Sequence, residues 1–152
     1  MSAAPRRSGA RSQARRLAMQ GLYQYQITGH DGDEILRQLA DATGFEKADR
    51  DYLAELIHGV LSGQKALDDS IGLHADRPVA QLDPIERAIL WIGTYELKFR
   101  DDVPFKVIIN EAINLSRRFG ADESHKYINA VLDRAAAIER GGRSPDTKAR
   151  VR

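Results

Sequence analysis

Residues 82–137 read LDPIERAILWIGTYELKFRDDVPFKVIINEAINLSRRFGADESHKYINAVLDRAAA. Apolar side chains recur in this stretch at the three- and four-residue spacing of amphipathic helices, in three successive segments. The first helix is expected over 84–100, because Asp83 can cap its N-terminus and Pro84 suits the first helical position. The stretch therefore predicts an all-α fold.

The second and third helices of this stretch also have recognisable ends. Pro104 disfavours helical backbone at the residue before it and suits a helix start, so a helix is expected over 104–119. Gly120 is typical of the position that follows a helix, and Asp122 can cap a third helix over 123–138.

The rest of the chain has helical periodicity as well. Helices are expected over about 12–26, 33–42 and 47–74, and Gly59 and Gly63 weaken the last, which leaves one long helix or two shorter ones. No segment shows the alternation of a strand, so the chain is predicted to be a single compact bundle of about seven helices. Expected core residues include Ala14, Leu17, Ala18, Leu22, Tyr25, Leu56, Ile89, Ile108, Phe119, Ile128 and Leu132.

Composition divides the chain into three regions. Residues 1–10 are small, polar and basic and are expected to form a flexible arm. Residues 11–139 are expected to form one helical domain. Residues 140–152 contain Gly141 and Pro145 but no apolar periodicity, so a disordered basic tail is expected there.

The composition also excludes several classes of protein. Of the 152 residues, 42% are hydrophobic, which is enough for a core, and none is cysteine, which excludes disulfides, thiolate metal sites and cysteine catalysis. No apolar run approaches the roughly 18 residues that span a membrane. The N-terminal arginines are not followed by a hydrophobic segment, so no secretory signal and a cytoplasmic location are expected.

The net charge of +1 combines basic ends with an acidic body. Residues 1–20 carry a charge of +5 and residues 140–152 carry +4, which leaves −8 for residues 21–139. This asymmetry predicts a polyanion that is contacted at one place. The alternative is that the basic ends only aid solubility, and this alternative is stronger for the C-terminal end.

No segment carries the residues of a catalytic, cofactor or metal site. Phosphate-binding loops and a nucleophile elbow are absent from the sequence. The histidines have no paired spacing of metal ligands; they are His30, His58, His74 and His125. The adjacent pairs Asp68–Asp69 and Asp101–Asp102 are expected at solvated turns or helix ends. The residues therefore do not predict an enzyme.

The first predicted helix combines arginine with an aromatic side chain. Arg15, Met19 and Tyr23 follow one another at intervals of four residues, beside the apolar face. Arginine neutralises phosphates and tyrosine stacks on unpaired bases, which is the chemistry of single-stranded RNA binding. Tyr127, which follows Lys126, is a second candidate, although it is equally compatible with a core position.

Two motifs in the C-terminal half resemble those of a known family. DVPFKVIINEAINLSRRFG at 102–120 and SHKYINAVLD at 124–133 resemble the NusB family of bacterial transcription antitermination factors, and the resemblance extends from about Arg11 to Ala137. It implies two helical subdomains, no cofactor and an RNA surface. The RNA-binding residues that it implies, together with the adjacent basic segment, are Arg7, Arg11, Arg15, Arg16, Tyr23, Lys126 and Tyr127.

The resemblance also implies partners. The RNA would be boxA-like, a short single-stranded element of nascent ribosomal RNA transcripts, and the protein partner would be NusE, the small-subunit ribosomal protein. NusA, NusG and RNA polymerase would join them indirectly. Glu86 matches a family glutamate near the NusE and RNA contact surface, with little expected role in the fold beyond its place at the positive end of a helix dipole.

Three questions stay open at the level of the sequence. Ser12 and Gln13 interrupt the arginine run of the first helix, where the family pattern is denser in arginine. A helical adaptor that binds only proteins, or a detached NusB-like domain of an RNA methyltransferase, would be alternatives to an antitermination factor. Some NusB proteins are dimers, and the sequence does not distinguish a monomer from a homodimer.

Overall fold

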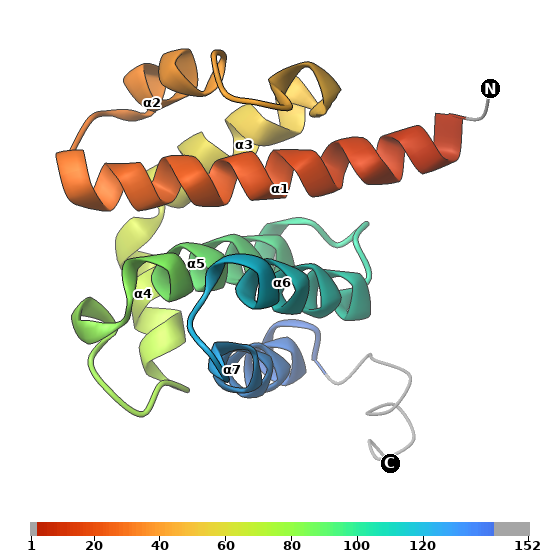
Figure 1. Cartoon of the computed structure of the whole chain (residues 1–152). Helices are drawn as coiled ribbons and strands as arrows, with labels where there is room; N and C mark the ends of the chain where they lie inside the picture. The colour runs from red at the N-terminus through yellow and green to blue at the C-terminus, as the bar shows by residue number, and fades with distance from the viewer. Residues whose placement is uncertain (1–2, 142–152) are drawn as a thin grey trace. The chain divides into compact units, whose positions relative to one another are not determined.

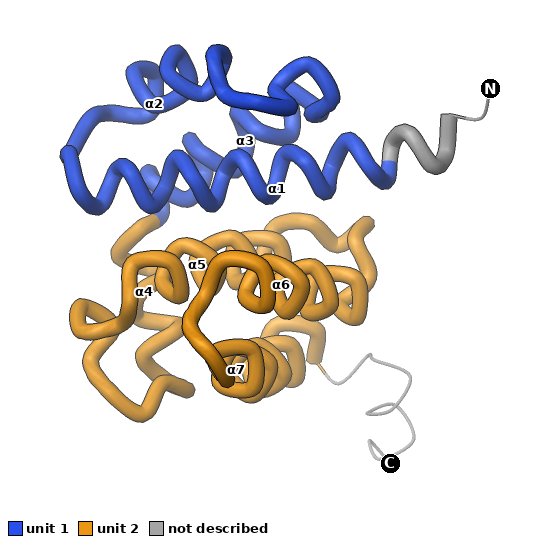
Figure 2. Tube along the Cα trace, viewed as in Figure 1, with its two compact units in different colours: residues 1–63 blue, residues 64–152 orange. Residues whose placement is uncertain are grey.

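The computed structural model describes residues 3–141, with side chains from residue 8 onward, and this part of the chain contains seven α-helices and no strand. The helices form two compact units, Met1–Gly63 and Gln64–Arg152 (Figure 2). The expected all-α fold is confirmed. The two units agree with the two helical subdomains that the family resemblance implies.

Unit 1 is built around its first helix. It contains α1 (Ala3–Thr28), α2 (Gly32–Leu39), the short 3-10 helix η1 (Phe45–Lys47) and α3 (Arg50–Ser62) (Figure 1). Helix α1 packs against the other three elements. Aspartate side chains cap α2 and α3, which explains why these helices begin where they do.

Unit 2 is built around its second α-helix. It contains α4 (Gln64–Gly72), η2 (Val79–Gln81), α5 (Pro84–Phe99), α6 (Phe105–Phe119) and α7 (Ser124–Glu139) (Figure 1). Helix α5 packs against α4, α6 and α7, which accounts for its almost continuous burial. None of the described helices is long and apolar enough to cross a membrane.

Close approach of α1 and α2 depends on Gly21. A Cβ atom at this position would lie 2.7 Å from Ile35 Cγ2 and 2.9 Å from Leu39 Cδ1, so only glycine allows the two helices to pack this tightly. The predicted apolar face of α1 is confirmed at Ala14, Leu17, Ala18 and Leu22, whereas Tyr25 is only half-buried.

Two helix boundaries differ from the sequence expectation or refine it. Helix α1 begins at Ala3, within the segment expected to be a flexible arm, so the helix is longer than its apolar periodicity indicated. The segment 47–74 divides into α3 and α4 at Gly63, whose N–H donates to the carbonyl of Gly59 at the end of α3. The division of this segment therefore falls at one of the two glycines that weakened it.

The connection between α6 and α7 corrects two expectations, for Asp122 and Phe119, and confirms that Gly120 follows a helix. Asp122 does not cap α7; Glu123 occupies the N-cap position with φ 69° and without a capping side-chain bond, which is a strained backbone for a residue with a Cβ. Gly120 is extended, and a Cβ there would lie 2.8 Å from the Ser116 carbonyl oxygen. Phe119 is 39% exposed because it lies at the last turn of α6, beyond the core.

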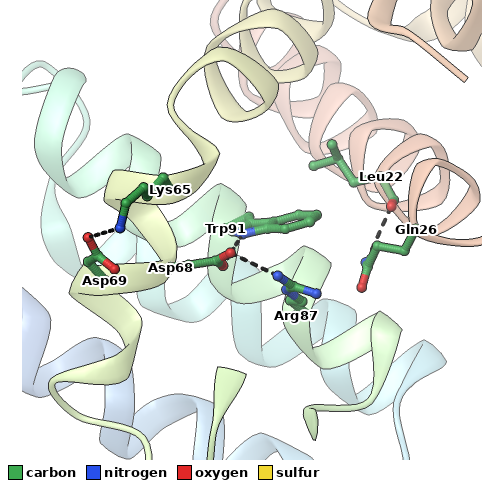
Figure 3. Close-up of polar contacts among 7 residues, drawn as sticks. All are labelled: Leu22, Gln26, Lys65, Asp68, Asp69, Arg87 and Trp91. Atoms are coloured by element: carbon green, nitrogen blue, oxygen red, sulfur yellow. Dashed lines mark hydrogen bonds and ion pairs between the residues drawn. The ribbon is translucent and has the colours of Figure 1, made fainter. Parts of the chain in front are cut away.

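Asp68 is a structural anchor of unit 2, which corrects the expectation of a solvated aspartate pair. Its carboxylate accepts hydrogen bonds from Trp91 Nε1 and from the Arg87 guanidinium, both at 2.8 Å (Figure 3). Trp91 is fully buried, and the Arg87 guanidinium lies 4.9 Å from its ring centroid. Asp69 instead forms an exposed ion pair with Lys65. Within α1 of unit 1, the Gln26 side chain donates to the Leu22 carbonyl (Figure 3).

The Asp68→Ala substitution should destabilise unit 2 strongly. It leaves a buried indole N–H and a half-buried guanidinium without their acceptor, which costs roughly 2–4 kcal/mol. Asp69→Ala is the matched control, because its exposed i,i+4 pair is worth about 0.3–0.5 kcal/mol. Denaturant unfolding followed by the fluorescence of Trp91, the single tryptophan of the chain, measures both variants. Equal midpoints for the two variants would contradict the anchor role.

Arg140 belongs to the folded unit, although we expected it to be the first residue of the tail. Its Nε donates to the Leu97 carbonyl at 3.1 Å, and its terminal nitrogen donates to the carbonyls of Glu96 and Arg100 at 3.3 and 3.1 Å. These acceptors lie at the C-terminus of α5, where carbonyls lack partners within the helix. Residues 142–152 of the expected tail lie outside the described residues.

Arg140→Ala should lower the melting temperature of the chain. The loss of a charged donor at the end of α5 costs about 1–2 kcal/mol, which corresponds to roughly 2–8 °C for a protein of this size. A chain that ends after Gly141 is the control and should melt like the full chain. Scanning calorimetry measures the melting temperatures of the variant and the truncated chain. An unchanged melting temperature for Arg140→Ala would show that this residue does not contribute to the folded unit.

Candidate nucleic-acid interface

Two arginines of α1 share one aromatic ring in unit 1. The guanidinium carbon of Arg11 lies 4.4 Å from the ring centroid of Tyr52, and that of Arg15 lies 5.5 Å from the same centroid. Tyr52 is only 3% exposed, so the ring is a buried platform for both side chains. A cation held over an aromatic face keeps its positive charge while its position is restricted.

Asp49 places this platform. Its backbone N–H donates to the Ala10 carbonyl of α1 at 3.0 Å, and its side chain accepts from the N–H of Tyr52 at 3.0 Å. The first bond joins the start of α3 to α1, and the second is an N-cap that fixes Tyr52 in the first turn. One residue therefore sets both the helix start and the ring beneath the arginines.

Arg16 points to a different neighbour. Its Nε donates to Gln13 Oε1 and its terminal nitrogen donates to the Thr43 carbonyl, both at 2.8 Å. The turn after Thr43 contains Gly44 with φ 88°, and a Cβ on Gly44 would lie 2.7 Å from the Arg16 guanidinium. Arg16 therefore supports the turn between α2 and α3.

The predicted stripe on α1 is less exposed than we expected. Arg15 is 3% exposed and Met19 is 4% exposed, whereas Tyr23 is 38% exposed and presents its ring to solvent. The error comes from the width of the buried face, since α1 packs against several elements of unit 1. The side chain of Arg7 lies outside the described residues.

In unit 2 a buried hydrogen bond joins the starts of α5 and α7. Ser124 Oγ donates to the Glu86 carboxylate at 2.7 Å, and the two residues are 5% and 8% exposed. Glu86 N–H in turn donates to the Asp83 cap at 3.2 Å. Glu86 therefore has a direct role in the fold, in contrast to our expectation of a small one.

Tyr127 lies one turn further along α7, beneath a loop arginine. The guanidinium carbon of Arg77 is 4.6 Å from the Tyr127 ring centroid. Burial raises the pKa of the Tyr127 phenol above its usual value. The negative charges of Asp76 and Glu86 act in the same direction, and the positive charge of Arg77 opposes them. The ring is half-buried, between the exposed and core positions that the sequence left open.

Lys126 is exposed but already paired. Its Nζ lies 2.6 Å from the Glu123 carboxylate, and both side chains are about 70% open to solvent, at 72% and 68%. Such an exposed i,i+3 pair contributes little to stability. The pair matters for the local charge instead, because the Glu123 carboxylate reduces the positive potential that Lys126 presents to an anion.

The structure gathers the predicted residues into two separate groups. Arg11, Arg15, Arg16 and Tyr23 belong to unit 1, and Glu86, Lys126 and Tyr127 belong to unit 2. Sequence reasoning missed Tyr52 as a partner of the arginines, and it missed the loop residue Arg77, which no periodicity marks. A local signal for Tyr52 was available, because it lies three residues after Asp49, a typical N-cap residue.

Comparisons with known proteins point to one family. The sequence model of the NusB family matches residues 12–137. The transcription antitermination protein NusB of Paraburkholderia phytofirmans is 46% identical over 128 residues, which cover 84% of this chain and 89% of that protein. NusB of Halorhodospira halophila is 49% identical over 127 residues, which cover 84% and 81%.

Solved structures show the same fold. A crystal form of T. maritima NusB superimposes with a TM-score of 0.76 at 28% identity and covers 92% of this chain and 96% of that chain. A crystal structure of the antitermination factors NusB and NusE in complex with dsRNA gives 0.73 at 19% identity over 84% and 96%, and at this identity it shows the fold alone.

The fold and these two groups of side chains define an all-helical protein of two units, each with an arginine held on a tyrosine ring. The family model covers most of the chain and the relatives exceed 40% identity over more than four-fifths of it. The chain belongs to the NusB family.

Glu86→Ala should destabilise unit 2, because it leaves the Ser124 hydroxyl buried without an acceptor at a cost of about 1–3 kcal/mol. Glu86→Gln should cost less, since its amide oxygen still accepts the bond. The double variant Glu86→Ala/Ser124→Ala is the control and should recover part of the loss. Urea unfolding of the wild type, the single variants Glu86→Ala and Ser124→Ala, and the double variant measures the coupling. Additive losses from the two alanine substitutions would show that the bond contributes nothing.

Proposed function

We propose that this chain is a transcription antitermination factor that binds boxA-like single-stranded RNA in nascent ribosomal RNA transcripts together with NusE. The family match over residues 12–137 carries the proposal. Support comes from the relatives, which are named transcription antitermination proteins, and from the crystallised complex of NusB, NusE and RNA, whose NusB chain has the same fold.

The chemistry of unit 1 fits RNA. Arg11 on the Tyr52 ring supplies positive charge, and the exposed ring of Tyr23 offers a stacking surface on the same helix. In this proposal NusA, NusG and RNA polymerase join the NusB–NusE–RNA complex. The protein would act in the cytoplasm, and its role would not be catalytic. In this proposal the chain needs no cofactor.

The relatives also bear on the methyltransferase alternative. The matched regions cover 89% and 81% of the two antitermination proteins, so these relatives are no longer than a NusB domain with short extensions. This similarity supports the antitermination role over a detached domain of an enzyme. The protein-only adaptor differs from the proposal in one respect, because it predicts that RNA is not bound.

RNA binding should depend on Tyr23. Tyr23→Ala should weaken the binding of boxA-like RNA by roughly 1–3 kcal/mol, because a stacked base loses its platform, while Tyr23→Phe should retain most of the affinity. Fluorescence anisotropy with labelled RNA, with and without NusE, measures the effect. Tyr25→Ala on the same helix is the control for a lost aromatic ring. If the wild-type chain binds NusE but no RNA under any condition, the adaptor is the correct function.

Glu123→Gln should strengthen RNA binding at the start of α7. The change removes a carboxylate that repels phosphate, and it releases Lys126 from its 2.6 Å ion pair. The gain should be larger at low salt, because exposed charges are screened over about 8–10 Å at physiological ionic strength. Anisotropy titrations at two salt concentrations test this, with Asp133→Asn on the same helix as control. Equal or weaker affinity for Glu123→Gln would place the RNA away from α7.

A further inference from the structure

Arg77 is a partly exposed cation in a loop of unit 2 and lies against the ring of Tyr127. It lies in the connection between α4 and η2, its side chain is 42% exposed, and its guanidinium stacks at 4.6 Å over the Tyr127 ring. Nε donates to the Asp76 carboxylate at 3.0 Å. Among the described residues, its two terminal nitrogens have no hydrogen-bond acceptor.

We propose that Arg77 binds a phosphate of the single-stranded RNA beside Tyr127, and that it is the main phosphate-binding cation of unit 2. This inference rests on the proposed function and identifies a contact residue that the family resemblance did not provide. The tyrosine ring contacts the guanidinium without using its N–H groups, so the terminal nitrogens of this partly exposed side chain are available to a ligand. A planar fork of donors in a fixed orientation matches two oxygens of a phosphate.

Lys126 is the competing cation, and its surroundings suit the role less well. Its ammonium group is a flexible point charge that is paired with Glu123 at 2.6 Å, whereas Arg77 is oriented by an aromatic ring. Asp76 restrains Arg77 in the free protein, but it contacts only Nε and is itself 69% exposed. A phosphate can therefore bind to the terminal nitrogens without displacing Asp76.

The stack also changes the expected role of Tyr127. Arg77 covers one face of the ring, so a base can reach only the other face, and the ring is half-buried. Tyr127 then acts chiefly as a positioning residue for Arg77. Tyr127→Phe should preserve this function, because the ring and its quadrupole are retained.

The test uses the full chain and labelled boxA-like single-stranded RNA, with affinity measured at several salt concentrations. Arg77→Ala should lower the affinity about tenfold, the loss expected for one charge-assisted contact, and should reduce the log–log salt slope by about 0.7. Arg77→Lys should keep the slope but bind more weakly than wild type, because the charge remains and the stacked fork is lost. Lys65→Ala, an exposed and ion-paired lysine on α4, is the control and should change neither value.

Asp76→Asn supplies a test of opposite sign. Removing this carboxylate frees Arg77 and deletes a repulsive charge, so binding should tighten, most at low salt. A merely structural role of the Asp76–Arg77 pair would make both variants weaker binders. If wild type binds RNA and Arg77→Ala keeps its affinity and slope, this inference is wrong and the proposed function stands. If wild type binds no RNA, both are wrong.

Discussion

Tyr52 supports the guanidinium groups of Arg11 and Arg15 on one buried ring, and the basic part of α1 depends on this contact. The ring is positioned by Asp49, which bonds α1 through Ala10 and caps α3 at the same time. An arginine stacked on an aromatic face gains about 0.5–2 kcal/mol without losing its charge. Packing in unit 1 and the placement of two cationic side chains of α1 therefore arise from the same set of contacts.

Unit 2 uses the same physical device with different elements. Arg77 lies over Tyr127, and the buried bond between Ser124 and Glu86 fixes the start of the helix that carries this tyrosine. Glu86 therefore has a structural role in addition to any role at the partner surface. A Glu86 variant that assembles poorly has to be checked for stability, because unfolding alone would also reduce assembly. The strained backbone of Glu123 lies at the same helix start, where local strain often accompanies a functional site.

Local sequence signals predicted much of the fold, and long-range contacts escaped them. The cap at Asp83 and the break at Gly63 were predictable because each acts within one turn of its own helix. Asp68 looked like a surface aspartate because its partner Trp91 is 23 residues away, and Arg140 looked like tail because its acceptors belong to α5. In the candidate site, Tyr23 was correctly placed at the surface, but the burial of Arg15 and the Arg77–Tyr127 stack depend on tertiary packing.

The location of the RNA is the central claim, and backbone NMR of the full chain tests it most directly. On titration of 15N-labelled protein with boxA-like single-stranded RNA, the account predicts chemical-shift changes in α1 from Arg11 to Tyr23, at Arg77 and at the start of α7 around Tyr127. Signals of α2, which carries no predicted contact, should stay in place. Changes confined to α2 and α6, or no changes at RNA concentrations that saturate binding in the presence of NusE, would contradict the account.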